Sequence, residues 1–116
     1  MALKLKRIYD EPSSADGVRV LVDRLWPRGI SKEKAKIDEW MRDIAPSNEL
    51  RKWVHEDPSR WAAFKRKYFK VLREQEEAID QISKLAKRKT ITLLYAAKDT
   101  ERNNAVALKE YIEQAE

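Results

Sequence analysis

Hydrophobic positions follow two different periods along this chain, and the change of period separates predicted strands from predicted helices. Residues 3–9 (LKLKRIY) largely alternate apolar and polar side chains, which predicts a half-exposed strand at a sheet edge with its lysines on the open face. Residues 18–22 are mostly apolar and β-branched, which predicts a second strand. Residues 90–96 form a nearly continuous apolar run, which is typical of a central strand covered on both faces.

Small polar residues mark the predicted starts of the first helices, because their side chains accept hydrogen bonds from free backbone N–H groups. Ser31 is expected to cap a short turn of helix. Ser47 is expected to cap a helix over residues 48–54. Asp57 is followed by Pro58, a residue type favoured at the first helical position, so another helix is predicted to start there.

Apolar residues recur at helical spacing from Trp61 onward, which predicts an amphipathic helical region. A single helix over residues 58–88 would be about 45 Å long at 1.5 Å per residue, longer than a domain of this size is wide. We therefore expect the helix to break within residues 73–76. A further amphipathic helix is predicted over residues 103–114, whereas residues 37–44 fit a strand or a helix equally well.

The predicted strands alternate with the predicted helices, and this order favours the α/β fold class. The expected architecture is a single small three-layer domain spanning residues 1–116, with a short, mostly parallel sheet flanked by helices. A length of 116 residues leaves room for one hydrophobic core and no second domain.

Charge and composition narrow the classes of function. The formal net charge of +5 favours anionic partners, either a small anionic ligand or nucleic acid. The chain has no cysteine, which excludes disulfides, thiol nucleophiles, iron–sulfur clusters and thiolate zinc sites. Its two glycines cannot form a glycine-rich dinucleotide fingerprint or a phosphate-binding P-loop.

The remaining absences set further expectations. His55 is the only histidine, and no carboxylates are spaced to complete a metal site with it, so we expect no metal and no cofactor. The sequence has no signal peptide and no apolar run near the roughly 20 residues of a membrane span, so we expect a cytoplasmic protein without membrane contact. The oligomeric state stays open.

Residues 22–31 (VDRLWPRGIS) are the most informative segment for function. The predicted strand stops there and is followed at once by Asp23, Arg24, Trp26 and Arg28. The carboxyl ends of parallel strands are where α/β sheets bind ligands. The segment therefore predicts a ligand site at this edge of the sheet.

Other segments are expected to reach the same edge, because parallel strands end on one side of a sheet. We expect Asp23, Arg24, Ser47 and Lys98 to lie around one depression. Helix starts at Ser47 and Asn103 would add free N–H groups and partial positive charge, which attract anions. The candidate ligand-binding residues are Arg24, Trp26, Arg28, Ser47, Lys98, Asn103 and Asn104. The candidate general acids or bases are Asp23 and Asp99.

A purely structural role is the alternative for these residues. Arg24 paired with Asp99, or Asp23 paired with Lys98, would form an ion-pair network without chemistry. Trp26 is open to two interpretations, since its ring could stack on a base or sugar or could cover the end of the core.

Three segments in combination closely resemble the YeaO-like family, a group of small bacterial and archaeal proteins classed as a domain of unknown function. They are residues 22–31 (VDRLWPRGIS), 44–53 (IAPSNELRKW) and 93–108 (LLYAAKDTERNNAVAL). The likeness covers nearly the whole chain, with Ile44 standing where the family usually has leucine. The resemblance implies that these segments belong together in one domain, and it implies no particular reaction.

The favoured interpretation is a domain that binds a small phosphate- or carboxylate-bearing ligand at the carboxyl ends of its strands. An enzyme of unassigned class remains open. The alternative is a nucleic-acid-binding accessory protein with a basic helix face. That face would comprise Arg66, Lys70, Arg73, Lys87, Arg88 and Lys89. An interaction module without chemistry is a third class.

Overall fold

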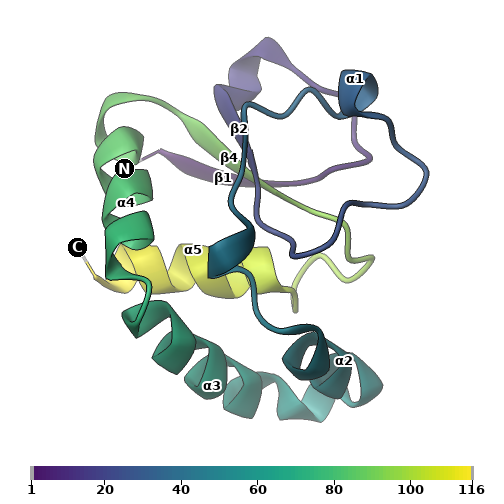
Figure 1. Cartoon of the computed structure of the whole chain (residues 1–116), viewed down its shortest axis with the longest axis vertical. Helices are drawn as coiled ribbons and strands as arrows, with labels where there is room; N and C mark the ends of the chain where they lie inside the picture. The colour runs from purple at the N-terminus through teal and green to yellow at the C-terminus, as the bar shows by residue number, and fades with distance from the viewer. Residues whose placement is uncertain (1, 116) are drawn as a thin grey trace.

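The computed structural model describes residues 2–115 and contains a four-stranded sheet with helices packed mainly against one face (Figure 1). The strands lie in the order β1-β4-β2-β3, and every neighbouring pair is parallel. This arrangement confirms the predicted α/β class and parallel sheet. The strands are β1 (Leu3–Arg7), β2 (Val18–Leu21), β3 (Glu39–Trp40) and β4 (Ile91–Tyr95).

The helices begin and end close to the predicted positions. The side chains of Ser31, Ser47 and Asp57 accept hydrogen bonds from backbone N–H groups two or three residues further on, as expected of caps. The long helical region breaks at Glu74 and Gln75, inside the expected interval. The helices are α1 (Lys32–Ala35), α2 (Asn48–Glu56), α3 (Trp61–Arg73), α4 (Glu76–Arg88) and α5 (Asn104–Gln114).

The ambiguous residues 37–44 form neither a full strand nor an α-helix. Only the two residues of β3 pair with β2, and the chain then tightens into a 3₁₀ turn over Arg42–Ile44. The indole N–H of Trp40 donates to the backbone oxygen of Asp23 at 2.7 Å. This bond ties β3 to the end of β2, and long-range contacts of this kind carry no local sequence signal.

The core lies on both sides of β4, whose five residues are all buried. On one face Ile91 and Leu93 pack in a large cluster with residues of α2, α3, α4 and α5. On the other face Leu94 packs in a smaller cluster with Ile8 and Ala35. Figure 1 shows α1 on this second side, opposite the four longer helices. The three layers are therefore unequal, and a loop with one short helix forms the thin one.

A buried ion pair fastens the thin layer to the sheet. Arg19 is only 4% exposed, and its Nη1 donates to Asp16 Oδ2 at 2.6 Å. Its Nη2 donates to the Ala35 carbonyl at 2.8 Å, at the end of α1. Lys6 on β1 also reaches Asp16, at 3.1 Å. Hydrogen bonds to both residues of the buried pair compensate for the loss of water around them.

Candidate functional site

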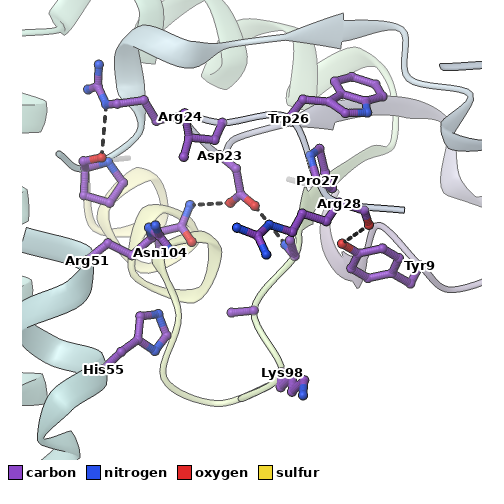
Figure 2. A pocket seen from close by; sticks show the side chains of 14 residues that line it. Tyr9, Asp23, Arg24, Trp26, Pro27, Arg28, Arg51, His55, Lys98 and Asn104 are labelled. Carbon is purple, nitrogen blue, oxygen red and sulfur yellow. Dashed lines mark hydrogen bonds between the residues drawn. The ribbon is translucent and has the colours of Figure 1, made fainter. Parts of the chain in front are cut away.

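A concave cavity of about 480 Å³ lies at the carboxyl ends of β2 and β4 (Figure 2). The loop after β2 contributes residues 23–28, the loop after β4 contributes residues 96–98, and α2 forms a further wall. Its volume falls within the range of about 300–1,000 Å³ typical of small-molecule sites. The cavity is therefore placed where parallel sheets usually bind ligands.

Most of the candidate residues line this cavity. They are Asp23, Arg24, Trp26, Arg28, Lys98 and Asn104. The structure thus brings Asp23, Arg24 and Lys98 around one depression, as predicted. The fourth residue of that prediction, Ser47, does not line the cavity. Its neighbour Pro46 does.

The other three candidates, Ser47, Asn103 and Asp99, lie outside the lining of this cavity. The Ser47 hydroxyl caps α2 by accepting from Leu50 N at 3.1 Å. The buried Asn103 side chain caps α5 and donates to the backbone oxygen of Asp99 at 2.9 Å. Asp99 lines a smaller adjoining depression, which shares His55 and Lys98 with the main cavity.

Asp23 lies at the junction of three elements on the cavity wall. Its Oδ2 accepts from the Ala96 backbone N–H at 2.9 Å, and its Oδ1 accepts from Asn104 Nδ2 at 3.1 Å. Burial raises the pKa of Asp23, because the ionised form loses water, and the hydrogen bonds from Asn104 and Ala96 oppose this effect. The charges of Arg51 and His55 also act to lower it.

Arg24 is held by backbone oxygens. Its Nη2 donates to the Ala45 carbonyl at 2.8 Å and its Nε donates to the Pro46 carbonyl at 3.2 Å. These bonds connect the loop after β2 to the start of α2 and leave the positive charge without a neutralising carboxylate. Arg24 therefore shapes the cavity and adds positive potential to its wall.

Trp26 is fixed by contacts outside the cavity. Its indole N–H donates to the Ile30 carbonyl at 2.8 Å, and its ring meets Trp40 edge to face at 5.4 Å. The ring packs against the smaller core cluster. Of its two predicted roles, covering the core is thus observed, and stacking on a ligand stays a prediction.

Neither of the two ion pairs considered from the sequence is present. Arg24 contacts carbonyl oxygens, and Asp99 pairs with Arg102 at 3.1 Å. Backbone N–H groups of Glu101 and Arg102 and the Arg102 side chain hold the pKa of Asp99 below its usual value. Lys98 is exposed and makes no hydrogen bond or salt bridge within residues 2–115.

Two cationic or ionisable residues on α2 complete the cavity and were missing from the sequence prediction. Arg51 and His55 lie four residues apart on the same face of the helix, and both line the cavity. Their i, i+4 spacing after the Ser47 cap was the available signal. In Figure 2 they approach from one side, while Tyr9 stands on the opposite side.

The cavity therefore collects cationic side chains that the rest of the described chain does not neutralise. The charged groups of Arg28, Arg51 and Lys98 make no hydrogen bond or salt bridge within residues 2–115. Unpaired cations converging on one concave surface provide the charge-assisted donors that phosphate and carboxylate groups require. In the same part of the chain, no group of three or more His, Asp or Glu side chains is arranged to hold a metal ion.

The helices of residues 2–115 are too short or too polar to cross a membrane. This finding agrees with the sequence, in which no long apolar run occurs.

Comparison with known proteins shows which family and which relatives this chain resembles. Residues 2–116 match the model of a protein family described as the inactive DUF488-N3 subclade. The chain is 42% identical over 112 residues to the uncharacterized protein YeaO of Escherichia coli, and the alignment covers 97% of both chains. It is 36% identical over 110 residues to an uncharacterized protein of Mycobacterium bovis, covering 95% of this chain and 92% of the relative. No solved structure shows a significant match to the chain.

Proposed function

Because this chain belongs to the inactive DUF488-N3 subclade, we propose that it binds a small phosphate- or carboxylate-bearing ligand without transforming it chemically. The match to this family, together with the identity to YeaO, confirms the predicted resemblance to YeaO-like proteins. The proposal is carried by one observation, the convergence of Arg28, Arg51 and Lys98 on a single cavity.

The electrostatics of the cavity support anion binding. The low dielectric of the protein around a concave site focuses the field of nearby charges, so three cations there attract an anion more strongly than three cations spread over a surface. Arg28 and Arg51 offer planar guanidinium groups, which can donate two parallel hydrogen bonds to one phosphate or carboxylate. Lys98 adds a mobile point charge at the rim.

The hydrogen bonds of the two candidate acids, Asp23 and Asp99, support ligand binding rather than catalysis. Both oxygens of Asp23 accept hydrogen bonds that join β4 and α5 to the end of β2. Both oxygens of Asp99 accept bonds from its own loop, including one from Arg102 Nε at 3.1 Å. Hydrogen bonds of this kind favour the ionised form of a carboxylate and fix its position, which suits a structural role.

Isothermal titration calorimetry with inorganic pyrophosphate tests the proposal. Arg51→Ala removes charge-assisted hydrogen bonds worth about 1.5–3 kcal/mol, so we expect the affinity to fall roughly 10- to 150-fold. The matched control is Lys52→Ala, since Lys52 is exposed on the same helix outside the cavity lining and should leave the affinity unchanged. Equal losses in the two variants, or no binding by the unmodified protein to pyrophosphate or to dicarboxylates, would overturn the proposal.

A further inference from the structure

The cavity has a carboxylate among its cations, and this combination limits what can bind there. Asp23 lines the same cavity as Arg28, Arg51 and Lys98. A carboxylate offers about four lone-pair sites, and protein groups use two of those on Asp23. A bare anion beside Asp23 would be repelled, whereas a ligand with a hydroxyl group could donate a hydrogen bond to it. The favoured ligand therefore carries both an anionic group and a hydroxyl donor.

The cavity also has an exposed apolar wall. Within residues 2–115 the exposed large apolar side chains are Tyr9, Leu25 and Val71, and the first two line this cavity. Tyr9 is 41% exposed and Leu25 is 55% exposed, and the two gather at one concave surface, which is more informative than apolar residues scattered singly. A ligand with a planar or apolar part would cover both.

The ring of Tyr9 is held in place before any ligand binds. Its hydroxyl donates to the Arg28 carbonyl at 2.7 Å, and the Arg7 guanidinium lies over the ring at 5.1 Å from its centre. Arg7 is itself fixed by the carbonyls of Ala97 and Ala96 at 2.9 and 3.1 Å. An aromatic ring fixed in this way loses little entropy when a base stacks on it.

We infer that the cavity binds a nucleoside monophosphate, with its phosphate at Arg51, a ribose hydroxyl at Asp23 and its base against Tyr9 and Leu25. This inference rests on the proposed function and names the ligand class for the same site. In Figure 2, Arg51 lies on one side of Asp23 and Tyr9 on the other, which matches the order phosphate, ribose, base along such a molecule, while Lys98 lies toward the Tyr9 side.

The location agrees with the physics of nucleotide recognition. Ligands bind beyond the carboxyl ends of parallel strands, and an acidic residue there commonly accepts a bond from a ribose hydroxyl. Glycine-rich loops hold phosphate through backbone N–H groups, and this chain, with two glycines, has no such loop. Here the guanidinium group of Arg51 replaces those backbone donors.

Calorimetric titration with a series of ligands tests each part of the inference. The series comprises the four ribonucleoside 5′-monophosphates, the 2′,3′-dideoxy form of the tightest one, ribose 5-phosphate and inorganic phosphate. We expect the best nucleotide to bind at least about tenfold more tightly than ribose 5-phosphate, because a stacked base contributes about 1–3 kcal/mol. The dideoxy form should lose about tenfold, and it probes Asp23 without altering a residue that holds the fold together.

Variants at Tyr9 isolate the contribution of the ring. Tyr9→Ala should lower nucleotide affinity about tenfold and leave phosphate affinity unchanged, whereas Tyr9→Phe keeps the ring under Arg7, loses only the hydroxyl bond and should lose much less affinity. Val71→Ala removes an exposed apolar side chain on α3 outside the cavity and is the matched control.

The outcomes separate this inference from the proposed function. If phosphate and pyrophosphate bind in an Arg51-dependent way but no nucleotide binds more tightly than ribose 5-phosphate, the nucleotide inference is overturned and anion binding stands. If Tyr9→Phe loses as much affinity as Tyr9→Ala, the base does not stack there and the inference is likewise overturned. If no anion binds in an Arg51-dependent way, both fall.

Discussion

The side-chain amide of Asn104 donates to Asp23 Oδ1 at 3.1 Å and to the Val22 carbonyl at 2.9 Å, across more than 80 residues of chain. Asn104 is the first residue of α5, and Asp23 follows the end of β2. The amide therefore fixes the start of the last helix against the loop that carries most of the cavity. The geometry of the site depends on this contact.

Replacing Asn104 by alanine should destabilise the fold. The variant leaves the buried Val22 carbonyl and one Asp23 oxygen without their partner, so we expect the free energy of unfolding to fall by about 1–3 kcal/mol. Urea denaturation followed by circular dichroism measures this change. Gln114→Ala, at an exposed position of the same helix, is the control and should change the midpoint little. Equal midpoints for the two variants would contradict the structural role of Asn104.

Replacing Arg28 by alanine should weaken ligand binding without weakening the fold. Arg28 is exposed, and its interaction with Tyr9 uses the backbone carbonyl, which the variant keeps. We expect a loss of about 1.5–3 kcal/mol in the binding free energy of pyrophosphate, measured by calorimetry. Thermal denaturation should show nearly the same midpoint for both proteins. An unchanged affinity would remove Arg28 from the site.

The ion pair at Asp16 should make stability depend on pH on the acid side. Burial alone would raise the pKa of Asp16, but hydrogen bonds from the Ser13 N–H, Lys6 and Arg19 outweigh it and hold the pKa below the usual 3.8. A lowered folded-state pKa contributes stability above the unfolded-state value, and this contribution is lost as the pH falls through the folded-state value.

The comparison of Asp16→Asn with the unmodified protein isolates this effect. The difference in their free energies of unfolding should be largest above about pH 5 and should shrink as the pH falls below the unfolded-state pKa. Urea denaturation at pH values from 7 down to 2 measures it. Two curves that decline in parallel would show that Asp16 does not carry the acid dependence.

The basic face of α3 distinguishes the nucleic-acid alternative. Arg66, Lys70 and Arg73 are exposed and share one side of the helix at i, i+4 and i+7 spacing. If they contacted duplex phosphates, log affinity would fall with log salt by about 0.9 per contact, and triple replacement by glutamine would flatten that slope.

We expect only weak nucleic-acid binding without sequence preference, because no DNA-reading motif precedes this helix and no exposed aromatic residues alternate with its cations. Fluorescence anisotropy at several salt concentrations measures it. Micromolar or tighter binding at physiological salt that vanishes in the triple variant would make nucleic acid the primary partner.

Some helices and strands could be predicted from the sequence and others could not. The caps at Ser47 and Asp57 were predictable because each hydrogen bond closes within three residues. The break at Glu74 followed from helix length alone. Residues 37–44 were not assignable, since the pairing of Trp40 depends on β2, which is distant in sequence.

The residues that line the cavity likewise divide into those that the sequence predicted and those that only the fold brings there. The sequence by itself determined that Asp23, Arg24 and Lys98 follow strands of one parallel sheet, and strands of such a sheet end on a common edge. The tertiary structure alone decided that Arg51 and His55 join them, because α2 is positioned by long-range contacts, namely the packing of Val54 in the core and the Arg24 bonds to Ala45 and Pro46.

Local periodicity and capping therefore determined the helices and the three longer strands of this protein, since helical hydrogen bonds and the apolar faces of helices and strands are set by neighbouring residues. The choice of which cations stay unpaired in the cavity, and which carboxylates hold the fold, belongs to the tertiary structure. Asp23 shows the physical reason, because its partners Ala96 and Asn104 are 73 and 81 residues away, and only the folded chain brings them within hydrogen-bond distance.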